Sequence, residues 1–280
     1  MIFGETQMKV AVIATSQGRG NTFVSTNLSA VSGWAYLDLN SPCYGYDKLN
    51  TEEGESKQLL WHSKKTISSC NDCEACVNAC VKKCFIKSET GTTLFCKGCA
   101  EGECTLSCDK DAVKSNTEEV GSLKLSKKDN FQIATVEEVS HLECEATECA
   151  INLLKDNNLI IDCADFEKNH TLTALKNSDY CVIVTEGDAI DFEVFKCIIR
   201  TCKLMGKPYG VIINRLTTVY DKLIDYCNLH STDILAKIPY NKRDERAILA
   251  GELIAKQKFT YKQHFNGAIT VIKKKLKKSQ

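Results

Sequence analysis

The sequence predicts an α/β protein whose mostly parallel sheet carries helices on both faces and is interrupted by a small, cysteine-rich α+β domain. Short apolar strands alternate with helical segments before residue 40 and again after residue 114. Such alternation produces parallel sheets through right-handed crossovers. Between these two stretches the long periodic runs disappear and cysteines crowd the chain, as in a small domain organised around metal. The cysteine block is therefore predicted to be an insertion within one α/β domain.

The domain boundaries follow from these changes of pattern. We predict that residues 8–57 and 115–272 form the two parts of the α/β domain, with the insertion at residues 58–114. Residues 273–280 form a basic tail. Because cations at the C-terminal end of a helix suit its dipole, we interpret this tail as a solvated helix end.

The elements of the α/β domain can be placed in order. Residues 9–14 form an apolar run typical of a buried parallel strand, and a loop with two glycines follows it. A helix is predicted at residues 22–32 and a second strand at 34–39. After the insertion, strands are predicted at 158–163, 180–185, 209–214 and 234–238, and helices at 144–156, 191–205 and 259–278.

Composition restricts the class of protein and its location. Lysine plus arginine equals aspartate plus glutamate, at 36 each, so charge does not favour nucleic acid or an anionic membrane as a partner. No apolar stretch approaches the roughly 18–20 residues that span a bilayer, and the first seven residues lack the features of a signal peptide. We therefore expect a cytoplasmic protein. In that reducing compartment, 17 cysteines indicate metal binding rather than disulfides.

The first cysteine group has the spacing C-x2-C-x2-C-x3-C, at Cys70, Cys73, Cys76 and Cys80. Bacterial ferredoxins have this spacing, and their fourth cysteine binds the other of two clusters. Three thiolates on a tight loop can bind one face of a cubane, so the fourth ligand must come from elsewhere in the chain.

The second group follows within forty residues, with the spacing C-x2-C-x4-C-x3-C, at Cys96, Cys99, Cys104 and Cys108. Exchange of the fourth ligands predicts two [4Fe-4S] clusters in a bacterial ferredoxin-like domain. The first ligand set is then Cys70, Cys73, Cys76 and Cys108, and the second ligand set is Cys80, Cys96, Cys99 and Cys104.

Three features depart from the usual ferredoxin pattern. The second loop is two residues longer, Val81 and Asp109 replace the prolines that usually follow the fourth cysteines, and Cys84 is a spare thiol close enough to compete as a ligand. The alternative interpretation is a pair of structural zinc sites, because thiolates in C-x2-C pairs also suit zinc.

The cysteines outside these groups are scattered. Three of them lie in apolar strand or helix patterns and are expected to be small core residues: Cys181, Cys197 and Cys202. Three others are open to either a core or a redox role: Cys144, Cys149 and Cys163.

A glycine loop, Ser16-Gln17-Gly18-Arg19-Gly20-Asn21-Thr22, lies between the first strand and the first helix. Free backbone N–H groups and the helix dipole favour phosphate at such a place. The loop resembles that of the MinD-type P-loop ATPases with a deviant Walker A sequence, in particular the branch with an inserted ferredoxin domain. The resemblance extends from Met8 to about Leu253. Gly18, Gly20 and Thr22 match the family loop, whereas Ser16 and Asn21 replace its two lysines.

This resemblance implies a P-loop NTPase-like fold and a site for ATP or ADP with Mg²⁺. Asp38 matches the first aspartate of a family pair, and Asp162 matches the Walker B aspartate that ends a strand. Asn214 matches an asparagine that helps to read the nucleotide base. With these residues, the nucleotide site implied by the resemblance consists of Gly18, Gly20, Asn21, Thr22, Asp38, Asp162 and Asn214.

The departures from the family bear on catalysis. Phosphoryl transfer depends on positioning and charge neutralisation. Loss of both lysines leaves no obvious ammonium for the phosphates, and Asn40 replaces an aspartate that could orient the attacking water. Arg19 could supply a cation, but its position in the loop favours solvent. We expect a scaffold that keeps the fold without efficient ATP hydrolysis.

The predicted function is electron transfer to or from a redox partner protein. The P-loop domain would act as a docking and dimerisation platform, and the family resemblance implies a homodimer or a heterodimer with an intact paralogue. Two alternatives remain. One is a nucleotide-gated ATPase that couples ATP binding to electron delivery or cluster assembly. The other is a carrier that transfers its clusters to an apo-acceptor.

Overall fold

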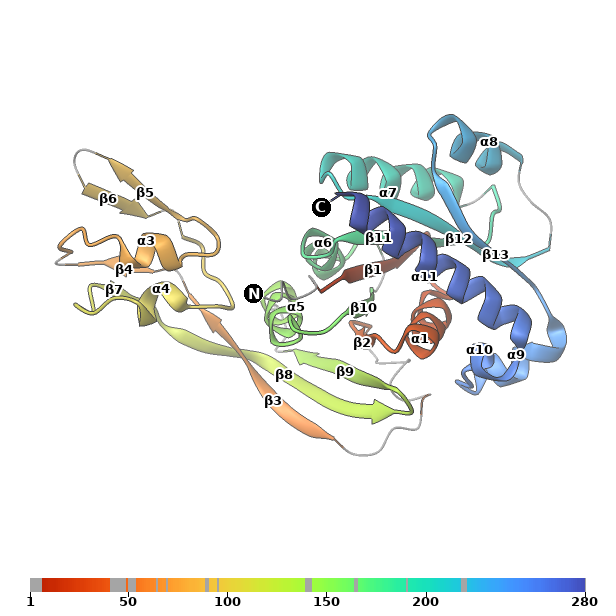
Figure 1. Cartoon of the computed structure of the whole chain (residues 1–280), viewed down its shortest axis with the longest axis horizontal. Coiled ribbons are helices and arrows are strands. Elements are labelled where there is room, and N and C mark those ends of the chain that lie inside the picture. Colours follow the sequence, from red (N-terminus) through yellow and green to blue (C-terminus); the bar gives the residue numbers. More distant parts are fainter. Residues whose placement is uncertain are drawn as a thin grey trace.

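The computed structural model describes residues 7–40, 49, 54–63, 65–68, 70–88, 91–94, 96–138, 143–163, 166–189, 191–217 and 221–279. Within these residues, a nine-stranded sheet has the order β13-β12-β11-β1-β10-β2-β9-β8-β3 (Figure 1). Neighbouring strands are parallel from β13 to β9. Within this sheet, the β9–β8 and β8–β3 pairs are antiparallel. The predicted α/β class with a mostly parallel sheet is confirmed.

The strands predicted from apolar runs are all present: β1 (Lys9–Ala14), β2 (Ala35–Asp38), β10 (Leu159–Asp162), β11 (Tyr180–Thr185), β12 (Tyr209–Leu216) and β13 (Asp233–Pro239). Three further strands on the other side of β2 were not predicted: β3 (Glu55–His62), β8 (Thr117–Lys128) and β9 (Phe131–Glu138).

Helices cover both faces of the sheet because successive strand residues point to opposite sides. In β1, Ala11 and Ile13 belong to one core, and Val10 and Val12 belong to another. The first core is covered by α5 (Glu143–Leu153), α6 (Asn169–Lys176), α7 (Phe192–Leu204) and α8 (Asp221–Leu229). The second core is covered by α1 (Asn21–Ser32), α9 (Lys242–Leu249), α10 (Ile254–Gln257) and α11 (Phe259–Ser279). None of the helices in the described ranges is both long and apolar enough to cross a bilayer.

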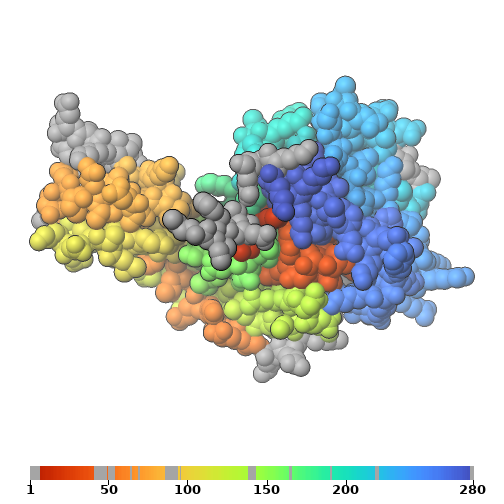
Figure 2. All heavy atoms as spheres, in the orientation of Figure 1, coloured from red at the N-terminus to blue at the C-terminus, as the bar shows by residue number. Residues whose placement is uncertain are grey.

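Strands β3 and β8 extend beyond the edge of the body and lead into a small unit, residues 63–116, which we call the cysteine module (Figure 1). Figure 2 shows it projecting from one end of the molecule, coloured orange to yellow-green. Its elements in chain order are β4 (Thr66–Ile67), α3 (Ala75–Ala79), β5 (Phe85–Ser88), β6 (Gly91–Leu94), α4 (Glu103–Leu106) and β7 (Val113–Lys114).

The cysteine module consists of two halves with the same order of strand, helix and strand. Its first strand pairs antiparallel with its last, and the two middle strands form a hairpin. The small core between the halves contains Cys76, Phe85, Cys104 and Val113, so half of its buried members are thiols. This composition agrees with a unit organised around a bound group rather than around apolar side chains.

Candidate functional site

The glycine loop lies at the carboxyl edge of the parallel sheet, where β1 leads into α1. Gly20 has a φ of +94°, and a Cβ there would lie 2.4 Å from Asn214 Nδ2, so only glycine fits. Helix α1 begins at Asn21 with no side-chain cap and no acidic residue in its first turn. Its first N–H groups and its dipole therefore give the loop the geometry of an anion site.

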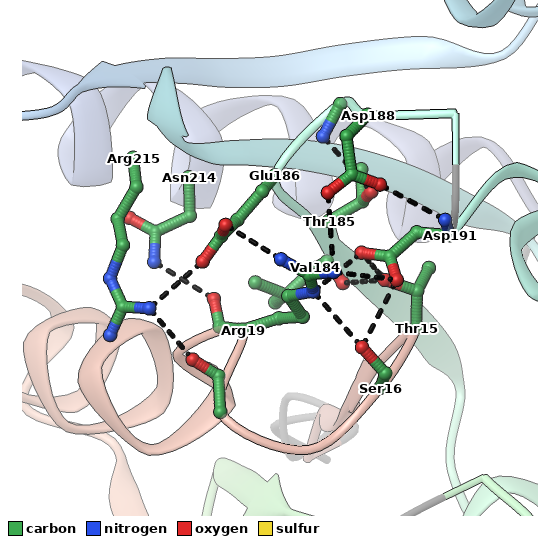
Figure 3. A network of polar contacts seen from close by, with 12 residues as sticks. Thr15, Ser16, Arg19, Val184, Thr185, Glu186, Asp188, Asp191, Asn214 and Arg215 are labelled. Carbon is green, nitrogen blue, oxygen red and sulfur yellow. Dashed lines mark hydrogen bonds and ion pairs between the residues drawn. The ribbon is translucent and has the colours of Figure 1, made fainter. Parts of the chain in front are cut away.

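Arg19 does not point to solvent as its position in the loop suggested. Its side chain is only 19% exposed and forms ion pairs with Glu186 (2.7 Å), Asp191 (2.7 Å) and Asp188 (3.2 Å) (Figure 3). Burial acts to lower the pKa of Arg19, but Asp191, Glu186 and Asp188 together raise it above its ordinary value. These carboxylates follow β11, the strand next to β1, which explains why the guanidinium turns inward.

Ser16, which replaces the first lysine, takes part in the same network. Its hydroxyl accepts a hydrogen bond from Arg19 Nε (2.9 Å) and donates one to Asp191 Oδ1 (3.0 Å). Thr15 Oγ1 donates to the other oxygen of Asp191 at 2.8 Å (Figure 3). Asp191 is 2% exposed, so the ion pair between Arg19 and Asp191 is largely shielded from water. The cation that this loop retains is therefore neutralised by carboxylates of its own chain.

Asn21, which replaces the second lysine, bonds to the end of β10. Its Nδ2 donates to Asp162 Oδ1 at 2.9 Å and to the Cys163 carbonyl oxygen at 2.7 Å. The second oxygen of Asp162 accepts from the Tyr36 hydroxyl at 2.8 Å. The amide thus takes up hydrogen-bonding capacity of Asp162 without supplying the charge of a lysine.

Asp162 and Asp38 lie close together at the ends of neighbouring strands. Asn40 connects them, because its Nδ2 donates to Asp38 Oδ1 (2.7 Å) and to Asp162 Oδ2 (3.0 Å). Both carboxyl groups are fully buried. Burial and, next, the neighbouring Asp38 raise the pKa of Asp162 to about 8, although hydrogen bonds from Thr22 and Tyr36 act to lower it. The structure therefore brings together four residues predicted for the nucleotide site, Asn21, Thr22, Asp38 and Asp162, and the raised pKa favours the protonated form of Asp162 near neutral pH.

Asn214 lies on the other side of the loop. Its Nδ2 donates to the Arg19 carbonyl oxygen at 2.9 Å, while Arg215 Nη1 donates to the Gly18 carbonyl oxygen at 2.8 Å (Figure 3). An open pocket adjoins Asn214 and is lined by aromatic side chains, among them Phe23 and Tyr261, and by polar ones such as Asn241. Aromatic faces of this kind suit a flat organic ring.

No protein-family model and no curated protein matches the sequence. Solved structures do match it. MinD of Pyrococcus horikoshii complexed with Mg-ADP has 14% identity and a TM-score of 0.56, covering 95% of this chain and 96% of that one. The chain has a MinD-like P-loop fold. An ATP complex of a Cyanothece McdA variant (11%, TM-score 0.56, 96% and 97% covered) and the MinC:MinD complex of Aquifex aeolicus (11%, 0.53, 95% and 95%) have the same fold.

The first ligand set lies at the outer part of the cysteine module. Cys70 and Cys73 are exposed, whereas Cys76 is buried. Burial raises the pKa of Cys76, and the neighbouring thiols of Cys70 and Cys108 raise it further. Cys108 therefore lies near Cys76 of the first loop. The crossed ligation itself stays a prediction. Backbone amides donate to two of these sulfurs, from Asp72 to Cys70 (3.3 Å) and from Ala112 to Cys108 (3.2 Å).

The second ligand set lines a small, open cavity. Its walls contain all four predicted thiols: Cys80, Cys96, Cys99 and Cys104. Burial raises the pKa of Cys104, and Cys99 and Cys80 contribute in the same direction. A cysteine of the first loop, Cys80, therefore lies with three cysteines of the second.

Backbone N–H groups point at the sulfurs of this second set. Gly98 donates to Cys96 (3.3 Å) and Gly102 donates to Cys99 (3.4 Å). Gly98 has a φ of +112°, and a Cβ there would lie 2.5 Å from Trp61 Nε1, so the loop can approach Trp61 only with glycine. Trp61 also packs against the main core, which places the second set next to the body.

Cys84 lines the same cavity as a fifth thiol. Burial raises its pKa to about 11, with further contributions from Cys80 and Cys96. Its backbone N–H also donates to Cys80 Sγ at 3.3 Å. The expectation that Cys84 competes as a ligand stays a prediction, and the structure shows the proximity that such competition needs.

Among the described residues, no group of three or more His, Cys, Asp or Glu side chains is placed so that it could hold a single metal ion. In a cubane each thiolate binds a different iron, so four ligands are spread more widely than around one ion. Cys181 and Cys202 are buried as predicted, but Cys197 is exposed, because it faces away from the sheet on α7.

Sequence reasoning missed one charged residue of the second site. Lys65 is 2% exposed and its Nζ lies 3.2 Å from Cys99 Sγ. It lies 34 positions before Cys99 and belongs to no recognisable motif.

Proposed function

We propose that this chain is an iron–sulfur electron-transfer protein whose cysteine module binds two [4Fe-4S] clusters on a P-loop scaffold that lacks efficient ATP hydrolysis. The observation that carries the proposal is the convergence of Cys80, Cys96, Cys99 and Cys104 on one small, open cavity. Cys80 comes from a different loop from the other three, so the cavity supports the exchanged ligation. The chemistry of its walls, thiols with amide donors, fits a cluster.

Each part of the module would have a distinct task. A bound [4Fe-4S] cluster supplies a one-electron carrier. The amides of Gly98 and Gly102 donate to the ligating sulfurs and so influence the reduction potential. The exposed Cys70 and Cys73 place the first ligand set where a redox partner protein can approach, while the second set lies inside, next to the body.

The P-loop side of the proposal rests on charge. Arg19 is neutralised by three carboxylates, and Asn21 is engaged with Asp162, so neither supplies a cation for phosphates. Since a missing cation in such a site costs on the order of 10³-fold in rate or more, hydrolysis should be very slow. The solved MinC:MinD complex supports the proposal that the scaffold docks a partner, either a second copy or an intact paralogue.

A nucleotide-gated device is the second candidate. The pocket beside Asn214, together with Thr22, Asp38 and Asp162, favours retained binding of ATP or ADP with Mg²⁺. Mg-ADP and ATP are the ligands of two of the similar structures. Under this function, nucleotide binding would change the reduction potential of a cluster.

The test is anaerobic purification of the full chain, followed by iron, sulfide and zinc analysis, EPR of the reduced protein and an ATP titration. Electron transfer predicts about eight irons and eight sulfides per chain with reversible reduction, as two [4Fe-4S] clusters require. Zinc, or metal-free protein that is silent in EPR, would contradict it. A potential that shifts on ATP addition would support the second candidate, and rapid loss of iron to an apo-acceptor would indicate a carrier.

A further inference from the structure

Lys65 is the only lysine found buried among the described residues, and it lines the cavity of the second ligand set. Its side chain is 2% exposed. The ammonium contacts Cys99 Sγ at 3.2 Å and the His62 carbonyl oxygen at 3.3 Å. Its polar contacts are therefore a thiol and a carbonyl rather than a carboxylate.

A buried ammonium is costly unless a negative charge compensates it. The ligand sulfurs can supply such charge, because Cys99 Sγ lies 3.2 Å from the ammonium and Cys104 lines the same cavity. Glu101 and Glu103 also line the cavity. Their negative charges would oppose the effect of the Lys65 ammonium on a negatively charged cluster.

We propose that Lys65 is a positioning residue that raises the reduction potential of the second cluster, so that an electron delivered to the module is held there. The inference rests on the proposed function. When the second site accepts one electron from a redox partner protein, its negative charge increases by one; no bond forms or breaks, and Lys65 keeps its proton. The ammonium stabilises this added charge strongly, because the interaction acts through a dry interior.

Lys97 provides the matched comparison. It lies in the second cysteine loop directly after Cys96, but its side chain is exposed. Water and salt screen an exposed charge. Two lysines beside the same cluster should therefore differ in their effect on its potential.

The experiment compares Lys65→Met and Lys65→Gln with Lys97→Met in the full chain, each analysed for iron and sulfide before an EPR-monitored redox titration. At a fixed potential, we expect the ratio of reduced to oxidised second cluster to fall about tenfold in both Lys65 variants, or about 59 mV for a one-electron couple. The first cluster serves as an internal reference and should not change. Glu101→Gln should shift the second cluster in the opposite direction.

Each other outcome has a clear meaning. Selective loss of the second cluster in the Lys65 variants would support the inference, because the same ammonium would then stabilise the charged site during assembly. An unchanged potential in fully loaded Lys65 variants would overturn it, as would equal effects on both clusters or an equal effect of Lys97→Met. Wild-type protein without clusters would instead contradict the proposed function.

Discussion

The glycine loop and the cysteine module treat their polar groups in opposite ways. In the loop, these groups bond to one another: Arg19 to three carboxylates, Asn21 to Asp162, and Asn214 to the Arg19 carbonyl oxygen. In the module, thiols from two loops converge on a cavity that also receives a buried ammonium. The polar groups of the first region are satisfied within the protein, whereas those of the second would, on the proposed function, bind a cluster.

This difference teaches that a fold and its chemistry can be lost or kept separately. The parallel strands are held by apolar side chains on both faces, away from the polar loop at the edge of the sheet. Beside the position where Ser16 replaces the first lysine, Arg19 and Asp191 neutralise each other. On the proposed function, the scaffold keeps its structure while the chemistry depends on the module.

The largest effect should follow removal of one thiol from each ligand set. Cys76→Ser should abolish the first cluster and Cys104→Ser the second, because each buried thiol belongs to a different set. Each variant should retain about half of the wild-type iron, since two [4Fe-4S] clusters contribute equally. Iron analysis and EPR of the reduced proteins check this.

The control for this pair is Cys197→Ser, which removes an exposed thiol on α7 and should leave iron unchanged. Cys80→Ser adds a test of Cys84: if the fifth thiol can substitute, the single variant keeps its second cluster and the Cys80→Ser, Cys84→Ser double variant loses it. Loss of the first cluster on replacing Cys80 would contradict the exchanged ligation.

The next effect concerns the buried carboxyl pair of the glycine-loop region. The pKa of Asp162 is raised to about 8, so between about pH 4 and pH 8 the folded chain binds a proton that the unfolded chain lacks. The stabilisation from this group is present at low pH and falls as pH rises to about 8, by at most about 1.4 kcal/mol per pH unit.

Asp162→Asn should remove this slope from the free energy of unfolding, because asparagine stays neutral. Urea unfolding of metal-free protein at pH 5, 6.5 and 8 measures it. Asp156→Asn, at an exposed position, is the control and should keep the wild-type slope. If wild type and Asp162→Asn have parallel pH profiles, the carboxyl pair does not share a proton in the folded protein.

Sequence alone predicted the six strands from β13 to β2 in the sheet order and missed β9, β8 and β3 at its other end. Strand β11 is a continuous apolar run that is buried along its whole length, which is the pattern of a central parallel strand. Strand β3 is exposed at most of its positions, and β8 is rich in charged residues. Their pairing is decided by neighbours rather than by propensity.

The same limit applies to the candidate site. Cysteine spacing predicted two ligand sets, and the four thiols of the second set line one cavity. That the two sets bind clusters stays a prediction. The environment of Arg19 was not predicted, since its partner Glu186 lies 167 positions away and only the sheet order brings it near. Lys65 was missed because it lies 34 positions before Cys99 and only the folding of the module brings the two together.

A smaller change should follow from restoring a lysine to the glycine loop. Asn21→Lys places an ammonium at the N-terminus of α1, where it could reach a phosphate, and a charge-assisted bond of this kind contributes about 1.5–3 kcal/mol. We expect Mg-ATP to bind at least about tenfold more tightly, which calorimetry can measure.

Gln17→Lys, which adds the same charge at an exposed position of the loop, should change the affinity little. Hydrolysis should remain slow in both variants because Arg19 stays neutralised and Asn40 is unchanged. Equal affinity gains in the two variants would mean that general charge attraction, rather than the position of residue 21, limits nucleotide binding.

The smallest effect is expected where the two regions meet. Lys82 of the module pairs with Glu148 of α5 at 2.6 Å, with side chains 31% and 14% exposed. Because a partly solvated pair contributes about 0–1 kcal/mol, a double-mutant cycle of Lys82→Met and Glu148→Gln should give a coupling below about 1 kcal/mol, with unchanged iron. The pairing of β3 with β8, which has one irregularity between Leu59 and Leu60, carries the module instead. A coupling of several kcal/mol, or loss of the second cluster in Glu148→Gln, would show that the ion pair itself joins the cluster site to the P-loop body.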